Sequence, residues 1–187
     1  MKIIDLTSEN TQAIQQAAQL LVEGFRDSGS NDWTTLEAAV SEVCESLQPG
    51  HISQVAIDDV GNVLGWLGGI EEYDGNVWEL HPLVVREDFR RQGVGRALVS
   101  NFEMQVLQRG GCTIFLGTDD ENNRTSISGV DLYPNVLGKL QQMKNLSGHP
   151  YEFYQKLGFE IVGIIPDANG IGKPDIQMAK RVRKYTS

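Results

Sequence analysis

Apolar residues follow first a strand-like and then a helical pattern at the start of the chain. Residues 2–6 predict a short strand, and the polar run behind it offers side chains that can cap a helix. Apolar residues then recur every three or four positions up to about residue 25, and again over about 34–47. Two helices are therefore predicted, the second capped by Thr34 or Thr35, with a polar loop over 26–33 between them.

Three consecutive segments in the middle of the chain predict strands, because each is rich in apolar and β-branched residues and is bounded by turn residues. They cover 51–58, 63–73 and 76–85, and the pair Asp74-Gly75 between the last two is typical of a hairpin. An amphipathic helix is then predicted from Val94 to the glycines at 110 and 111, which can end it.

The last third of the chain adds shorter elements. Strands are predicted over 112–116, 159–165 and 175–182, and helices over about 135–145 and 150–157. No repeat or linker divides the chain, so we expect one domain over residues 1–187. The order of the elements predicts a mixed α/β sheet with helices packed against it.

Composition narrows the class of partner. The 187 residues carry 16 Lys and Arg against 25 Asp and Glu, a formal net charge of -9. This balance argues against nucleic acid, because affinity for phosphates comes from Lys and Arg, and it leaves cationic partners open. The chain has no signal region and no apolar run of about 18 residues, so we expect a cytoplasmic protein without a membrane segment. Its two cysteines and three histidines lack the spacing of a metal site.

The most informative segment connects the strand at 76–85 to the amphipathic helix. It reads Arg90-Arg91-Gln92-Gly93-Val94-Gly95-Arg96. Glycines let the backbone approach a ligand, and the unpaired N–H groups of a helix start, together with the helix dipole, form an anion site suited to pyrophosphate. The three arginines add positive charge to an otherwise acidic chain. The alternative is a helix start in which the glycines serve packing only.

Known motifs narrow the anion further. A P-loop needs Gly-Lys-Ser/Thr and a dinucleotide fold needs a third glycine where Leu98 stands, so neither pattern fits. The arrangement R-x-x-G-x-G over 90–95, directly after a strand, resembles the acyl-CoA loop of the Gcn5-related N-acetyltransferase (GNAT) superfamily. The segment 154–159 likewise resembles the Y-x-K-x-G-F signature near the end of that superfamily.

Longer blocks resemble one branch of the superfamily, the chromosomal enterococcal type of aminoglycoside 6'-N-acetyltransferase. They include WELHPLVV at 78–85, LGTDD at 116–120 and HPYEFY at 149–154, and the resemblance spans roughly residues 77–180. Residues 1–70 match much less. The resemblance implies a central, mostly antiparallel, splayed sheet flanked by helices. It also implies acetyl-CoA as co-substrate, no metal, and a homodimer.

Side chains on the strand 76–85 are candidates for the reaction centre. Because side chains alternate along a strand, Glu79, His81 and Leu83 are expected on one face, with Glu79 and His81 about 7 Å apart at Cβ. Acetyl transfer needs a neutral amine, and a carboxylate beside the amine can accept its proton. The resemblance implies this role for Glu79, whose alternative is a surface glutamate in cross-strand pairing. His81 is either a proton relay or a structural histidine.

The end of this strand is expected to open the sheet. Pro82 cannot donate a ladder hydrogen bond, so the pairing should loosen there. The resemblance implies that the backbone N–H of Leu83 polarises the thioester carbonyl and that Val84 and Val85 line the path of pantetheine. It assigns protonation of the departing thiolate to Tyr154, for which Tyr151 is a rival. Further CoA contacts are implied for residues 90–96 and Lys156.

A polycationic acceptor needs carboxylates and an aromatic wall. The resemblance implies that Tyr73, Glu79 and Asp119, and next Asp120, bind it. The other carboxylates of the hairpin at 71–74 are more simply explained as a solvated turn.

Three functions therefore remain. The first is an acetyl-CoA-dependent aminoglycoside 6'-N-acetyltransferase that works by direct attack of the amine on the thioester. The second keeps the reaction but takes a polyamine or a basic peptide as acceptor. The third is an acyl-CoA-binding sensor without turnover, which would need neither Glu79 nor Tyr154.

Overall fold

The computed structural model describes residues 1–26 and 33–184. Within it the chain forms two compact units. The first unit comprises Met1–Ile114 together with the segment that begins at Val182, and the second comprises Phe115–Arg181. The expected single domain over 1–187 stays a prediction. Most of the loop expected at 26–33 lies outside the described residues.

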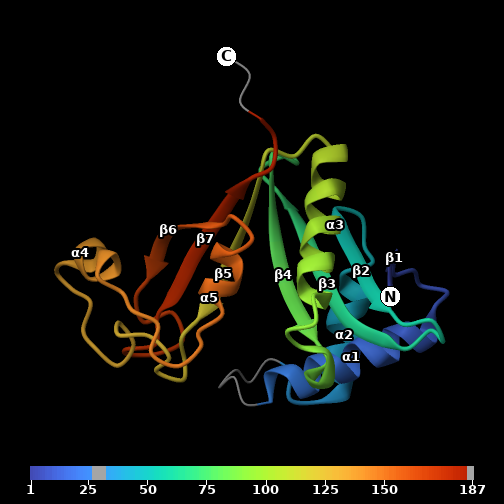
Figure 1. Cartoon of the computed structure of the whole chain (residues 1–187), viewed down its shortest axis with the longest axis horizontal. Coiled ribbons are helices and arrows are strands. Elements are labelled where there is room, and N and C mark those ends of the chain that lie inside the picture. The colour runs from blue at the N-terminus through green and yellow to red at the C-terminus, as the bar shows by residue number, and fades with distance from the viewer. Residues whose placement is uncertain (27–32, 185–187) are drawn as a thin grey trace. The chain divides into compact units, whose positions relative to one another are not determined.

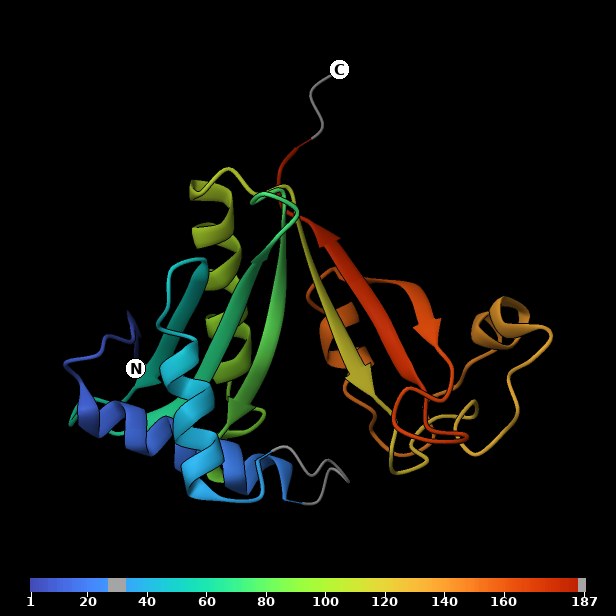
Figure 2. The same cartoon turned by 180° about the vertical axis from the view of Figure 1, so that it is seen from behind.

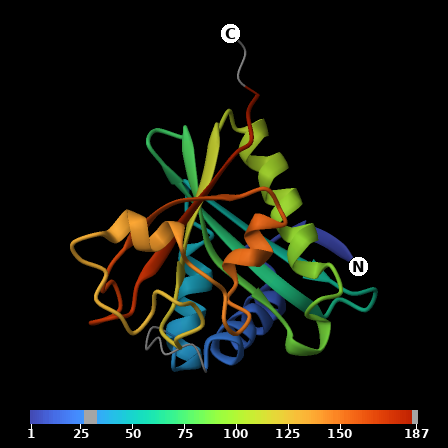
Figure 3. The same cartoon turned by 60° about the vertical axis from the view of Figure 1, so that its left-hand side comes forward.

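The first unit is built on an antiparallel sheet in the order β1-β2-β3-β4. Its strands are β1 (Lys2–Asp5), β2 (His51–Ile57), β3 (Val63–Glu72) and β4 (Val77–Val85). Helices α1 (Thr11–Phe25) and α2 (Leu36–Glu45) cover one face of this sheet, and α3 (Val94–Gln108) covers the other (Figure 1 and Figure 2). Figure 3 shows α3 running diagonally across the strands. These elements match the predicted ones to within a few residues at each end.

Both faces of this sheet carry a dense apolar core. On the α1 and α2 face, the completely buried Leu21 and Trp66 lie in one cluster with Val84. On the α3 face, Phe102 is completely buried, and a methyl group added at Gly69 would come within 2.2 Å of its ring. Burial of each such large side chain stabilises the fold by about 1.5–3 kcal/mol.

Local capping explains where the first two helices begin. The side chain of Asn10 accepts a hydrogen bond from the N–H of Ala13 at 3.1 Å, and that of Thr35 accepts one from the N–H of Ala38 at 3.2 Å. Each satisfies one backbone donor that the helix itself leaves unpaired. The predicted start signals are therefore confirmed, and Thr35 is the cap of α2.

The hairpin between β3 and β4 is also confirmed. Tyr73, Asp74 and Gly75 have positive φ angles of 50°, 54° and 79°, and the N–H of Asn76 donates to the carbonyl of Tyr73 at 3.2 Å. The turn therefore spans four residues, although the Asp74-Gly75 pair alone predicted it.

The second unit contains three strands in the order β5-β7-β6 and two short helices. They are β5 (Thr113–Asp119), which begins in the last residues of the first unit, β6 (Glu160–Ile165), β7 (Asp175–Arg181), α4 (Val136–Gln141) and α5 (Tyr151–Gln155). Strands β6 and β7 are antiparallel.

Two boundaries differ from the sequence prediction. Strand β5 continues to Asp119, three residues beyond its predicted end. Helix α4 ends at Gln141 instead of about residue 145, because the residues that follow it in the chain form hydrogen bonds with another loop. The N–H of Leu146 donates to the carbonyl of Arg124 at 2.7 Å, and that of Lys144 donates to the Ser126 hydroxyl at 3.0 Å. No helix in the described part of the chain is long and apolar enough to cross a membrane.

Candidate active site

Strand β4 carries a bulge at the position of Pro82. Leu83 pairs with Leu67 of β3, but Leu80 pairs with Gly69, so His81 and Pro82 together stand opposite the single residue Gly68. A methyl group at Gly68 would lie 2.5 Å from the carbonyl oxygen of His81, so this residue must be a glycine. The predicted loosening of the sheet at Pro82 is therefore confirmed.

The bulge changes which side chains share a face. Cross-strand partners lie on the same face of a sheet. Glu79 pairs with Ile70, which alternates with Trp66 on the α1 and α2 face, whereas Leu83 pairs with Leu67 on the α3 face. The expected common face of Glu79, His81 and Leu83 is therefore wrong for Leu83, because the extra residue of the bulge reverses the alternation behind it.

The ladder pattern shows where the backbone N–H of Leu83 points. The N–H of Arg86 donates to the carbonyl of Leu64 at 2.9 Å, which makes these two residues a hydrogen-bonded pair. Bonded and non-bonded pairs alternate along an antiparallel ladder, so Leu83 and Val85 occupy non-bonded positions. Their N–H groups therefore point away from β3, out of the other edge of β4.

Glu79 lies half-buried on the α1 and α2 face. Burial raises the pKa of its carboxyl above the usual value, and the charge of Glu72 adds to this shift, whereas His81 opposes it. A carboxylate whose pKa is raised holds a proton more readily than a solvated one. Glu79 is therefore suited to accept a proton from a bound ammonium.

Trp33 is a residue of this face that the sequence analysis missed. Its indole lies against the imidazole of His81, with ring centroids 5.6 Å apart and planes inclined by 49°. It also borders a pocket of about 200 Å³ with Phe25 and Arg26. The available signal was a tryptophan at the end of a polar segment, just before a helix cap.

The loop before α3 has the geometry of an anion site. It begins with a short 3-10 turn, Glu87–Phe89, inside the segment expected to be irregular. Gly93 has φ 90° and a methyl group there would touch nothing within 4 Å. No side chain caps α3, and the first hydrogen bond inside the helix runs from the N–H of Ala97 to the carbonyl of Gly93 at 2.9 Å. The N–H groups of residues 94–96 are therefore presented at the helix start, where the dipole favours an anion.

The arginines of this loop are exposed. Arg90, Arg91 and Arg96 form no salt bridge with any residue that the structure describes. Arg90 is oriented by a hydrogen bond from its Nε to the carbonyl of Val85 at 3.2 Å, and Gln92 donates from its amide to the carbonyl of Asp88 at 2.6 Å. Three exposed cations around uncapped N–H groups fit a pyrophosphate.

Tyr154 of α5 lies in a tight aromatic environment in the second unit. Its ring packs edge-on against Phe153 and Phe159, with centroids 5.0 and 5.7 Å away. Burial raises the pKa of its hydroxyl, which therefore keeps its proton at neutral pH. Lys156, which is also expected to contact CoA, directly follows α5 in the chain and is exposed.

The rival, Tyr151, packs against a structural histidine. The Nδ1 atom of His149 accepts a hydrogen bond from the N–H of Tyr151 at 3.2 Å, so Nε2 carries the proton and donates to the carbonyl of Asp119 at 3.1 Å. Burial lowers the pKa of His149, so its imidazole stays neutral and keeps these two hydrogen bonds. His149 therefore ties the end of β5 to the start of α5.

The two neighbouring aspartates at the end of β5 differ in their surroundings. Asp119 is exposed and accepts a hydrogen bond from the side-chain amide of Asn169. Asp120 is only 1% exposed and accepts from the N–H groups of Arg124 and Thr125 at 2.7 and 2.8 Å and from the Thr125 hydroxyl at 2.6 Å. Its carboxylate is occupied by the loop that it folds, which argues against the expected contact of Asp120 with an acceptor.

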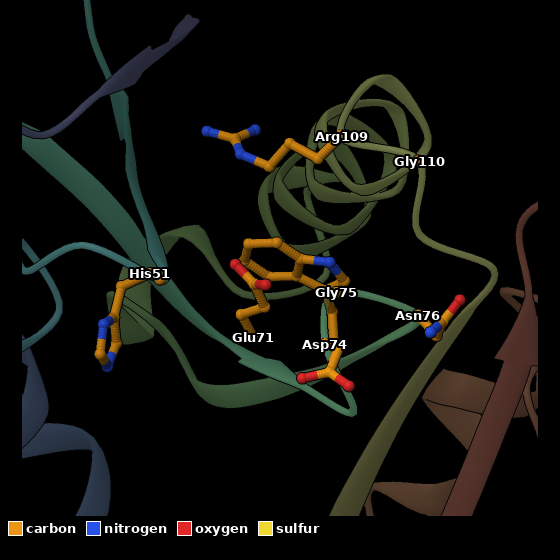
Figure 4. A pocket seen from close by; sticks show the side chains of 9 residues that line it. His51, Glu71, Asp74, Gly75, Asn76, Arg109 and Gly110 are labelled. Carbon is orange, nitrogen blue, oxygen red and sulfur yellow. The ribbon is translucent and has the colours of Figure 1, made fainter.

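The hairpin of the first unit forms a separate pocket of about 260 Å³ (Figure 4). Glu71 and Asp74 point toward it from the hairpin, and Arg109 contributes from the end of α3. Tyr73 is 74% exposed at the tip of the same turn. Neither Glu79 nor the loop at 90–96 lines this pocket, so its acidic residues are distinct from the predicted reaction centre.

The model of the acetyltransferase (GNAT) family matches residues 14–134, well over half of the chain. The chain belongs to the GNAT acetyltransferase family. The predicted GNAT fold, a mixed α/β arrangement with mostly antiparallel strands and flanking helices, is thereby confirmed. Comparison with curated proteins gives no match.

Three solved structures are similar to this GNAT chain over its whole length. An aminoglycoside 6'-N-acetyltransferase complexed with coenzyme A is 38% identical with a TM-score of 0.91, and the one from Enterococcus faecium is 38% identical with a TM-score of 0.90. An aminoglycoside 6'-acetyltransferase type Ii is 34% identical with a TM-score of 0.77. In each case the alignment covers 100% of both chains. The described residues of this GNAT protein contain no group of three or more His, Cys, Asp or Glu that could hold a metal ion.

Proposed function

We propose that this GNAT protein transfers the acetyl group of acetyl-CoA to the 6'-amino group of an aminoglycoside. The observation that carries the proposal is the full-length likeness, at 38% identity, to two solved aminoglycoside 6'-N-acetyltransferases, one of them complexed with coenzyme A. The likeness covers both chains completely, so it includes residues 1–70, whose sequence resembles the enterococcal type much less than the later motifs do. It therefore supports the acceptor class as well as the reaction.

The start of α3 would hold the co-substrate. The pyrophosphate of acetyl-CoA would fit at the backbone N–H groups that follow Gly93. The exposed side chains of Arg90, Arg91 and Arg96 would add positive charge around it. The outward N–H groups of Leu83 and Val85 on β4 would guide the pantetheine, which carries amides that can bond to a strand edge. The same donor of Leu83 would polarise the thioester carbonyl as negative charge develops on its oxygen.

The chemical step needs no covalent enzyme intermediate. The lone pair of the acceptor amine attacks the thioester carbon, and the carbon–sulfur bond breaks as the tetrahedral species collapses. Glu79 accepts the proton that the amine nitrogen loses, directly or through water. Tyr154, which burial keeps protonated at neutral pH, would donate its proton to the departing CoA thiolate, and the resulting tyrosinate would regain a proton from water.

The acceptor would be held by acidic and aromatic groups. Asp119 presents an exposed carboxylate, and Tyr73 presents an exposed ring. Glu79 would contribute both to binding and to proton transfer. Asp120 would not contact the acceptor, because its oxygens already accept three hydrogen bonds from its own loop.

An assay of CoA release separates the three hypotheses. Purified protein is mixed with acetyl-CoA and a kanamycin-type aminoglycoside, a polyamine such as spermidine, or a Lys-rich peptide. We expect release with the aminoglycoside and acetylation at its 6'-amine by mass spectrometry. Release only with a polyamine or peptide would support the second hypothesis. Binding of acetyl-CoA without release by any amine would support the sensor.

We further propose that the enzyme is a homodimer. Strand β6 ends its sheet and exposes Val162 and Ile165 by 63% and 51%, and Leu137 of α4 is 66% exposed. Exposed apolar side chains on one unit favour an interface with another chain. Sedimentation velocity tests this assembly, and a sedimentation coefficient of the monomer at micromolar concentration would refute it.

Location and physiological role are tested in cells. We propose that the enzyme acts in the cytoplasm and confers resistance to aminoglycosides. Expression in a susceptible bacterium is expected to raise the inhibitory concentration of kanamycin, with the protein recovered in the cytoplasmic fraction. An unchanged inhibitory concentration with active purified enzyme would indicate another physiological acceptor.

A further inference from the structure

The indole of Trp33 is held by both helices on the Glu79 face of the first unit. Its N–H donates to the carboxylate of Glu42 in α2 at 3.2 Å. Its ring meets that of Phe25, the last residue of α1, at 4.8 Å with planes inclined by 76°. Two independent contacts, one polar and one aromatic, therefore fix the orientation of this side chain.

The imidazole of His81 has little else to orient it. His81 lies in the bulge of β4, where the register with β3 is interrupted, and its side chain is exposed. Among the residues that the structure describes, its ring has a contact with Trp33 at 5.6 Å and no hydrogen-bond partner. The conformation of His81 therefore depends on the aromatic contact more than on the strand that carries it.

We propose that Trp33 is a positioning residue that holds the His81 imidazole beside the Glu79 carboxylate. The inference rests on the proposed function, in which Glu79 takes the proton from the acceptor ammonium. A held imidazole can receive this proton from Glu79 and release it to water, which regenerates the carboxylate for the next turnover. In this role Trp33 acts through its contact with His81.

The charges around Glu79 and His81 determine in which direction the pKa of Glu79 changes when the imidazole is released. Glu72 of β3 raises the pKa of Glu79, whereas His81 lowers it. Arg26 borders the Trp33 pocket from the end of α1, and Glu42 faces it from α2. If the imidazole turns into solvent, its favourable effect on the ionised carboxylate is lost and the pKa of Glu79 rises. Activity is then lost at a higher pH as the solution is acidified.

The expected size follows from the strength of one aromatic contact. Such a contact changes the population of the oriented ring by about 2- to 10-fold. Trp33→Leu should therefore lower kcat/KM for the aminoglycoside by about this factor and move the acidic limb of its pH profile upward. The KM for acetyl-CoA should not change. Trp33→Phe, which keeps a ring, should recover most of the activity.

A double-mutant cycle separates positioning from simple destabilisation. Trp33→Leu, His81→Gln and the double variant are compared by CoA release from pH 5 to 9, with melting temperatures recorded for each. If Trp33 acts through His81, the double variant is no slower than His81→Gln alone. The inference would be overturned if the two substitutions lowered kcat/KM by factors that multiply in the double variant. It would also be overturned if the acidic limb of the pH profile of Trp33→Leu coincided with that of the wild type. Glu42→Gln, which keeps a hydrogen-bond acceptor, serves as the matched control and should behave nearly as wild type.

One readout does not depend on turnover. The ring current of an indole 5.6 Å away should shift the NMR resonances of the His81 ring protons, and Trp33→Leu should abolish that shift while Trp33→Phe keeps part of it. If the wild type releases no CoA with any amine, the proposed function fails, and this spectrum still tests the contact. If the wild type is active and the His81 resonances of Trp33→Leu are unchanged, the positioning role fails alone.

Discussion

The anion site at the start of α3 can be tested at one backbone position. Gly93 adopts φ 90°, and a methyl group at this position would meet no atom within 4 Å. Gly93→Ala therefore introduces no clash, and its whole cost is that of a left-handed conformation, about 1–2 kcal/mol for a non-glycine residue. The loop can relieve this strain only by rotating the N–H groups of residues 94–96 away from the pyrophosphate.

The magnitude for binding follows directly. If the strain must be met each time acetyl-CoA binds, the affinity falls by about 5- to 30-fold, since about 1.4 kcal/mol corresponds to a factor of ten. Isothermal titration calorimetry measures this change in Kd. The melting temperature should change little, because the loop of the free protein can relax; a fall of about 2–8 °C with an unchanged Kd, at roughly 2–4 °C per kcal/mol for a chain of this size, would contradict this reasoning.

Gly61 provides the matched control. It has φ 91° and likewise no atom within 4 Å of an added methyl group, but it lies in the turn between β2 and β3. Gly61→Ala introduces the same local strain and should keep the affinity for acetyl-CoA. If both variants bind equally well, or if both weaken equally, the placement of the pyrophosphate at the start of α3 is refuted.

Three further substitutions test separate roles. Glu79→Gln should leave the Kd of acetyl-CoA unchanged and lower kcat by about 10²–10⁴-fold in the CoA-release assay; equal turnover would remove Glu79 from the mechanism. Because the folded pKa of Glu79 is raised, its ionised form opposes folding at neutral pH. The melting temperature of Glu79→Gln should therefore be no lower than that of the wild type at pH 7–8, and its advantage should shrink as the pH falls through the folded pKa; a lower melting temperature at neutral pH would contradict this reasoning. Tyr154→Phe removes the proposed proton donor and should slow acetyl transfer. Stability should change little, because the Tyr154 hydroxyl has no hydrogen-bond partner among the described residues and its ring contacts are kept. An unchanged rate constant of acetyl transfer in single-turnover measurements would exclude Tyr154 as the donor. Asp120→Ala should destabilise the fold by about 3 kcal/mol or more in urea unfolding, since it leaves the donors of Arg124 and Thr125 unpaired; full stability with a raised KM for the aminoglycoside would restore Asp120 as an acceptor ligand.

Local chemistry determined much of what could be predicted from the sequence. Asn10 and Thr35 cap helices because a short polar side chain bonds the nearest free N–H, which requires only neighbouring residues. Gly93 permits a backbone turn that other residues resist, and the arginines around it supply charge wherever the loop lies. The hairpin at Asp74-Gly75 and the loosened pairing at Pro82 depend in the same way on backbone rules that act within a few residues.

The tertiary structure alone decided the features that depend on partners distant in the sequence. The alternation of Glu79, His81 and Leu83 is broken because β3 supplies one residue opposite two of β4, which no pattern within β4 reveals. Asp119 and Asp120 are the same residue type in adjacent positions, but only Asp120 is enclosed by the loop that follows it. Trp33 reaches His81 across 48 positions of the chain because two helices hold it there. Capping and turn chemistry act over three or four residues, whereas burial and ring contacts are set by whichever segments the core brings together.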